Sequence, residues 1–181
     1  MAKAIMNEVT KVFRGAIGGL VFRQMPDGSI VVSRAPHYGR RKFSKGQKDH
    51  QQRFQEAASY ARGAARVQPI YAELAKGTMK TAYNIALSDW FNPPVIHQIQ
   101  RKDGRILVEA SDNVMVTKVV ITILDEQEKV LENGEGTRQE APSTGSGWWE
   151  YVPNTAGKTV SAEAWDLAGN KTLKVFETFR V

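Results

Sequence analysis

The chain has 181 residues, of which 41% are hydrophobic and none is cysteine. This apolar content is ordinary for a globular protein, and the lack of thiols excludes disulfides, thiolate metal sites and a cysteine nucleophile. The net charge of +6 is unevenly distributed: residues 1–94 hold 15 Lys/Arg and 6 Asp/Glu, whereas residues 95–181 hold 10 and 13. The basic half is therefore expected to meet either nucleic acid or the acidic half of a neighbouring copy.

The hydropathy pattern indicates no membrane insertion. No stretch reaches the roughly 18 apolar residues of a membrane-spanning segment, and the first residues lack the apolar run of a secretory signal. We expect synthesis in the cytoplasm without a signal peptide. The final location would be a phage particle or an extracellular assembly reached by another route.

Residues 19–35 predict a β-hairpin. Two β-branched runs flank Pro26-Asp27-Gly28, in which proline presets φ and glycine tolerates positive φ. Three glycines before the hairpin indicate either a bend or a flexible entry loop. The first 14 residues fit a helical face and a strand equally well. One apolar set alternates along the two strands of the hairpin: Leu20, Phe22, Ile30 and Val32.

A helical region should follow a basic connector at residues 36–43. Ser44 and Gln47 have the spacing of a capping box, in which each side chain bonds the backbone N–H of the other residue. They predict a helix from about 45 to 66, with a narrow apolar face of mostly small residues.

Two shorter helices are expected next. Pro69 suits the first turn of a second helix that ends near Gly77. Thr78 is then expected to cap a third helix over 79–91, which Asn92-Pro93-Pro94 terminates, because proline disfavours the helical conformation of the residue before it.

From Val95 onward the apolar pattern has a period of two and predicts an antiparallel β-sandwich. Its longest loop is expected at residues 134–147, which are polar and rich in glycine. The predicted strands are 95–100, 105–110, 116–124, 129–132, 147–152, 158–165 and 171–181. The turn signals are Lys102-Asp103-Gly104, Asn133-Gly134, Pro153-Asn154 and Ala168-Gly169-Asn170.

The C-terminal part resembles bacterial immunoglobulin-like and fibronectin type III-like modules. The resemblance rests on two segments, ASDNVMVTKVVITILDEQEKVLENGEG and SAEAWDLAGNKT. Their Asp112, Asp166, Gly169 and Asn170 match an Ala-x-Asp strand start and an Ala-x-Asp-x-x-Gly-Asn turn. The resemblance covers about residues 95–181 and implies a β-sandwich, but it implies no function, since sandwiches serve many.

The layout of the first half is similar to that of uncharacterised bacterial proteins that join a Gly-rich hairpin and short helices to a sandwich. The matching pieces are Gly18–Arg23, Gln47–Phe54 and Ala82-Tyr83-Asn84. This similarity implies an architecture and no activity.

The predicted fold class is α+β: an N-terminal β-hairpin and a short helical region, followed by an antiparallel immunoglobulin/fibronectin-like sandwich. We expect three parts. Residues 1–43 form an arm with the hairpin and the basic connector, residues 44–94 form the helical region, and residues 95–181 form the sandwich.

No set of residues has the spacing of a catalytic or metal site. The sequence lacks a phosphate-binding loop, a nucleophile elbow and a dinucleotide fingerprint. Asp125, Glu126 and Glu128 are interpreted as a solvated turn, with calcium binding as the less favoured alternative. The three histidines, which have no ligand-type neighbours at suitable spacing, are His37, His50 and His97. We expect a protein that is not an enzyme and uses no cofactor and no metal.

A basic cluster and a tryptophan pair are the remaining candidate sites. Basic side chains near aromatic residues can neutralise phosphates, although such runs are usually solvated faces. Trp148 and Trp149 should point to opposite faces of a strand, giving either an exposed ligand surface for sugar or protein or a core-and-rim pair. Trp165 is expected in the core. The basic cluster comprises Arg34, Arg40, Arg41, Lys42, Lys45, Lys48 and Arg53.

The pattern as a whole favours a structural protein that self-assembles as a homo-oligomer or larger assembly. It would belong to a filament, a phage particle or a contractile machine. The N-terminal hairpin of one copy would add to a sandwich edge of the next. The alternatives are a nucleic-acid-binding protein that uses residues 34–53 and a carbohydrate- or surface-binding module that uses the tryptophan pair.

Overall fold

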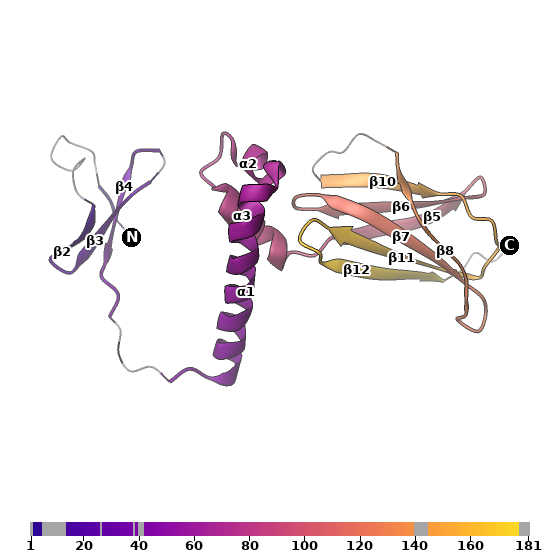
Figure 1. Ribbon diagram of the computed structural model, residues 1–181, viewed down its shortest axis with the longest axis horizontal. Coiled ribbons are helices and arrows are strands. Elements are labelled where there is room, and N and C mark those ends of the chain that lie inside the picture. The colour runs from indigo at the N-terminus through magenta and orange to yellow at the C-terminus, as the bar shows by residue number, and fades with distance from the viewer. Residues whose placement is uncertain are drawn as a thin grey trace. The chain divides into compact units, whose positions relative to one another are not determined.

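The computed structural model describes residues 2–4, 14–25, 27–37, 39, 42–139 and 145–177. These residues form helices and three four-stranded antiparallel sheets, an α+β layout that confirms the predicted fold class (Figure 1). The chain divides into two compact units, residues 1–52 and 53–181. The boundary expected between residues 94 and 95 lies inside the second unit.

The first unit holds a small sheet, and the predicted hairpin is its centre. A hydrogen bond from the Gly28 N–H to the Met25 carbonyl closes the turn, and Gly28 has a φ of 80°. Pro26 and residues 5–13 lie outside the described residues. Of the first 14 residues, which fitted a helix and a strand equally well, residues 2–4 are a strand. In the sheet order β1-β4-β3-β2, the elements are β1 (Ala2–Ala4), β2 (Gly15–Ile17), β3 (Leu20–Gln24) and β4 (Ile30–Arg34).

The expected arm therefore differs from a free hairpin. Strand β4 pairs with β1, and β3 pairs with β2, so both outer sides of the hairpin already have a partner strand. The edges of this sheet are β1 and β2, which a two-stranded prediction could not include.

The first helix, α1 (Lys45–Val67), begins at the predicted capping box. The Ser44 N–H donates to Oε1 of Gln47 at 2.9 Å, and the Gln47 N–H donates to Oγ of Ser44 at 3.3 Å. The predicted start and end are confirmed to within one residue. The second helix, α2 (Pro69–Ala75), has proline in its first turn, as predicted.

The third helix, α3 (Ala82–Phe91), starts later than predicted. Its N-cap is Thr81, whose side chain accepts a hydrogen bond from the Asn84 N–H at 3.2 Å. The predicted cap, Thr78, instead donates its hydroxyl to the Ala75 carbonyl and helps to close α2. Thr78 and Thr81 were both candidates for the N-cap of α3. Thr78 lies too close to the end of α2 to start a new helix, so the cap is Thr81.

The second unit contains two four-stranded sheets with the strand orders β5-β6-β10-β9 and β12-β11-β7-β8. Inward side chains of both sheets form one core, so the sheets pack face to face as predicted for a sandwich (Figure 1). The strands are β5 (Val95–Lys102), β6 (Arg105–Asp112), β7 (Val116–Leu124), β8 (Val130–Glu135), β9 (Thr137–Arg138), β10 (Gly145–Tyr151), β11 (Thr159–Asp166) and β12 (Lys171–Glu177).

One predicted turn is a strand. Asn133 and Gly134 lie inside β8, where they pair with Thr122 and Ile121 of β7. The ring of Tyr151 packs directly against Gly134, where a Cβ atom would lie 2.4 Å from the ring. The loop predicted at 134–147 contains the end of β8, the unpredicted strand β9 and the start of β10. Residues 140–144 of that loop lie outside the described residues.

A second core joins the helices to the sandwich. Tyr71 of α2, which is 0% exposed, packs with Ala86 of α3 and with Val114, which lies between β6 and β7. Met115 and Leu167 contribute from two connections at the same end of the sandwich. This shared core explains why the compact unit begins within α1 at residue 53 instead of at the first strand of the sandwich. Within the described residues, no helix combines the length and apolar character that crossing a membrane requires.

Candidate functional site

The four residues predicted for the assembly arm lie on one face of the first sheet. The register places Phe22 opposite Val32, and Gln24 opposite Ile30. Residues directly opposite each other in an antiparallel pair share a face. Ile17 of β2 lies opposite Leu20 and extends this mostly apolar face, which also carries Gln24 and Arg34 at its ends. Ile30 is 1% exposed, whereas Leu20 is 39% and Ile17 is 49% exposed.

The basic cluster is exposed wherever the structure describes it. Arg40 and Arg41 lie outside the described residues, and no ion pair within the described part of the chain involves the other five members. Such exposure suits a solvated face and an anion-binding face equally. The five exposed members are Arg34, Lys42, Lys45, Lys48 and Arg53.

The tryptophan pair divides as predicted, one inward and one outward. Trp149 is 5% exposed and belongs to the core between the sheets, while Trp148 is half-buried on the outer face of β10. The expectation that Trp165 lies in the core is wrong. The inward positions of β11 are taken by alanines 162 and 164, so Trp165 points outward. The ammonium groups of Lys118 and Lys171 lie 4.5 and 5.1 Å from its ring centroid.

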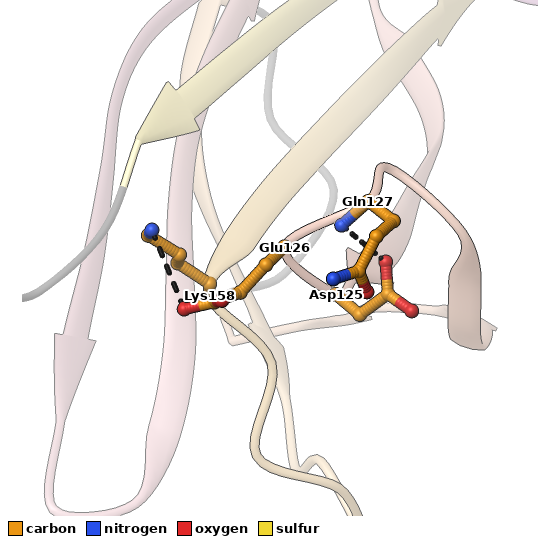
Figure 2. A network of polar contacts seen from close by, with 4 residues as sticks. All are labelled: Asp125, Glu126, Gln127 and Lys158. Atoms are coloured by element: carbon orange, nitrogen blue, oxygen red, sulfur yellow. Dashed lines mark hydrogen bonds and ion pairs between the residues drawn. The ribbon is translucent and has the colours of Figure 1, made fainter.

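The acidic turn between β7 and β8 is built mainly by backbone hydrogen bonds. Oδ1 of Asp125 accepts from the N–H groups of Gln127 and Lys129 at 2.8 and 2.9 Å. Glu126 and Lys158 form an exposed ion pair of 3.5 Å (Figure 2). These contacts describe a solvated turn whose carboxylates do not converge on one point.

Glu132 of β8 accepts hydrogen bonds from Tyr151, Asn154 and Thr155, and these bonds lower its pKa to about 2; the Tyr151 hydroxyl has the largest effect. A carboxyl with a depressed pKa contributes stability above its unfolded pKa and loses it as the pH falls through the folded value. We expect an NMR titration of the Glu132 carboxyl to have its midpoint near pH 2. Glu132→Gln should remove this part of the acid sensitivity, and a midpoint near the ordinary glutamate value would contradict the network.

A buried acidic cluster is the feature that the sequence analysis missed. Asp89 of α3, Asp112 at the end of β6 and Asp166 at the end of β11 each place a carboxylate oxygen within 4.8 Å of the others. Their exposed fractions are 0%, 9% and 4%. We call these three residues the aspartate trio. The resemblance to immunoglobulin-like modules had marked Asp112 and Asp166, but no sequence signal connected them with Asp89.

Tyrosines on two helices hold the first carboxylate of the trio. The Tyr71 hydroxyl donates to Oδ2 of Asp89 at 2.6 Å, and the Tyr60 hydroxyl lies 2.7 Å from that of Tyr71. Asn170 adds a link from the sandwich, since its side-chain amide donates to the carbonyls of Asp89 and Trp90. Asp89 is thereby fixed between α2 and the β11–β12 turn.

Turn backbones hold the other two carboxylates. Oδ2 of Asp112 accepts from the N–H groups of Val114 and Met115 at 2.7 and 2.9 Å. Both oxygens of Asp166 accept from Asn170, one from its backbone and one from its side chain, each at 2.7 Å. The tight turns at the ends of β6 and β11 therefore aim these side chains at the helices.

Burial governs the electrostatics of the trio. It raises the pKa of Asp89 to about 7; the Tyr71 hydrogen bond opposes this rise, and the charges of Asp112 and Asp166 add to it, as does a hydrogen bond between the protonated Asp89 and the Asp112 carboxylate. Burial also raises the pKa of Asp166. When both carboxyls are ionised, Oδ1 of Asp89 and Oδ1 of Asp112 are buried without a hydrogen-bond donor among the described residues. Among the described residues, no ion pair includes a member of the trio.

Comparison of the sequence with models of known protein families and with curated proteins finds no match.

Proposed function

We propose that the chain is a non-enzymatic structural protein that self-assembles, as a component of a filament, a phage particle or a contractile machine. The observation that carries this proposal is the apolar face of the first sheet. Of the described residues in β2, β3 and β4, Ile30 alone is buried. A sheet with one apolar face is stable only when that face packs against another layer, and small isolated sheets are marginal in water.

A second copy of the chain is the occupant that the charges favour. Residues 1–52 hold ten Lys/Arg and three Asp/Glu, so the first unit is strongly basic. Strand β8 is the last strand of its sheet among the described residues, exposes Val130 and Leu131, and continues from the acidic turn at Asp125. We infer a head-to-tail contact in which β2 of one copy adds to β8 of the next, because both are edge strands and the basic first unit complements the two glutamates of β8.

Such a contact joins unlike surfaces and is therefore heterologous. Repeated head-to-tail contacts give a closed ring or an open filament, according to the rotation between copies. The apolar face supplies most of the affinity, whereas the charges set orientation and association rate.

We propose further that the sandwich is of the immunoglobulin or fibronectin type III kind. When its strands are lettered in chain order with β8 as C′, the two sheets read ABED and GFCC′, the orders of those modules. The strand order alone supports this assignment, and self-assembly of the chain does not depend on it.

Ile17→Asp should weaken self-association by at least about tenfold, since it places a charge in the apolar contact. The measurement is the mass of the full chain by light scattering across a concentration series. High salt should weaken assembly only in part, because apolar contacts are not screened.

The matched control is Ala16→Asp. Ala16 is an exposed neighbour on the same strand whose side chain lies on the opposite face, so the change in charge is identical. Equal weakening by both variants would mean that net charge, and not the apolar face, drives association. A wild-type chain that stays monomeric at tens of micromolar would exclude the proposal.

A further inference from the structure

We propose that the aspartate trio, Asp89, Asp112 and Asp166, binds a calcium ion inside the second unit. The three side chains come from a helix and from two strand ends and converge to within 4.8 Å of one another. This inference concerns the interior of one compact unit, and it holds whether or not the chain self-assembles.

The hydrogen bonds around the trio have the pattern of a supporting shell around metal ligands. Asp89 and Asp112 each use Oδ2 to accept from the protein and leave Oδ1 without a donor. Asp166 is held by Asn170 and keeps further lone pairs, because each carboxylate oxygen can accept twice. Ligating carboxylates are typically oriented in this way by groups that do not themselves touch the metal.

The two unpartnered oxygens are the independent sign of a missing ligand. Asp89 is fully buried and Asp112 is 9% exposed, so water in bulk does not solvate their Oδ1 atoms. A buried polar atom without a partner is costly, and a carboxylate oxygen more so. A cation between these atoms would satisfy both oxygens at once.

The charge of the trio also favours a divalent cation over a shared proton. One proton between Asp89 and Asp112 would still leave two of the three negative charges in a site where no described ion pair offsets them. A divalent ion offsets two charges and attracts all three carboxylates, which repays their desolvation.

The spacing is compatible with calcium, and three protein carboxylates in one site suit calcium better than magnesium, which is usually held by one or two. Oxygens that bind calcium lie 2.3–2.6 Å from the ion, so two ligands can be separated by up to about 5 Å, whereas magnesium allows only about 4.2 Å. The 4.8 Å limit of the trio lies inside the calcium range. Calcium takes six to eight oxygens, and water would supply those that the trio does not.

Such an ion would tie α3 to the ends of β6 and β11. The helices and the sandwich share their second core at this place, around Tyr71 and Val114. Calcium should therefore stabilise the whole second unit by binding the folded chain and not the unfolded one.

The test is calorimetric titration of the chelator-treated full chain with calcium chloride, followed by thermal melts with and without calcium. We expect one binding event per chain and a higher melting temperature. Asp112→Asn should weaken calcium binding by at least about tenfold, because loss of even an outer-shell partner of a metal ligand typically costs that much and Asp112 is a direct ligand. The substitution preserves an acceptor for the N–H groups of Val114 and Met115, so the fold should be retained.

The control is Glu126→Gln, which removes one carboxylate from the exposed acidic turn of Figure 2 and should leave calcium binding unchanged. The proposal is overturned if the wild type shows neither binding heat nor a shift in melting temperature with millimolar calcium. It is also overturned if Glu126→Gln, and not Asp112→Asn, abolishes binding. Equal binding of magnesium chloride would overturn the choice of calcium. If Asp112→Asn failed to fold, the wild-type titration would decide the matter alone.

Discussion

Trp149→Ala should lower the free energy of unfolding of the second unit by about 3–5 kcal/mol, the usual cost of truncating a large aromatic side chain in a core. Trp149 is 5% exposed and packs with inward residues of both sheets. The guanidinium of Arg138 lies 5.7 Å from its ring centroid and would lose that contact too. Urea denaturation of the full chain, followed by circular dichroism, measures the change.

Trp165→Ala is the matched control, since it truncates the same side chain on the outer face of the same sandwich. It removes the contacts with Lys118 and Lys171, and we expect a loss of about 1 kcal/mol. A loss at Trp165 as large as that at Trp149 would mean that the assignment of inner and outer faces is wrong.

Tyr71→Phe should lower the free energy of unfolding by about 1–3 kcal/mol, measured in urea with a chelator present. The substitution removes only the hydroxyl, which donates to Oδ2 of Asp89 and bonds the Tyr60 hydroxyl. Asp89 would then lose its tyrosine donor inside the second core, and an unpartnered buried acceptor pays its full desolvation cost.

Tyr83→Phe provides the comparison for this substitution. Tyr83 packs against the same core and is half-buried, but its hydroxyl makes no hydrogen bond to any described residue. We expect a change of less than about 0.5 kcal/mol, as for substitutions that remove no buried contact. If both tyrosine variants behaved alike, the hydroxyl network of Asp89 would have no role in stability.

The local elements were predictable wherever a few neighbouring residues decide them. The capping box of Ser44 and Gln47 placed the start of α1, and the Asp27-Gly28 turn placed the β3–β4 hairpin. Period-two patterning located seven strands of the sandwich and divided Trp148 from Trp149. These predictions needed only hydrogen bonds and alternation over a handful of residues.

Predictions failed where a residue's role depends on what a distant segment supplies. Gly134 looked like a turn residue, but it lies in β8 because that segment pairs with β7, and it is glycine because the Tyr151 ring takes the space of a Cβ atom. Trp165 was expected in the core. Alternation along a strand shows which residues share a face, but it does not show which of the two faces packs against the core. The core positions of β11 belong to Ala162 and Ala164.

By itself, therefore, the sequence determined the α+β class, the hairpin, the position of the helices and the alternation of the sandwich, since each depends on local propensity and period. Only the tertiary structure decided that β1 and β2 flank the hairpin and that helices and sandwich share one core. It also brought together Asp89, Asp112 and Asp166, which are separated by 23 and 54 positions along the chain. No local pattern links such residues, because their proximity arises only when α3 packs against the ends of β6 and β11.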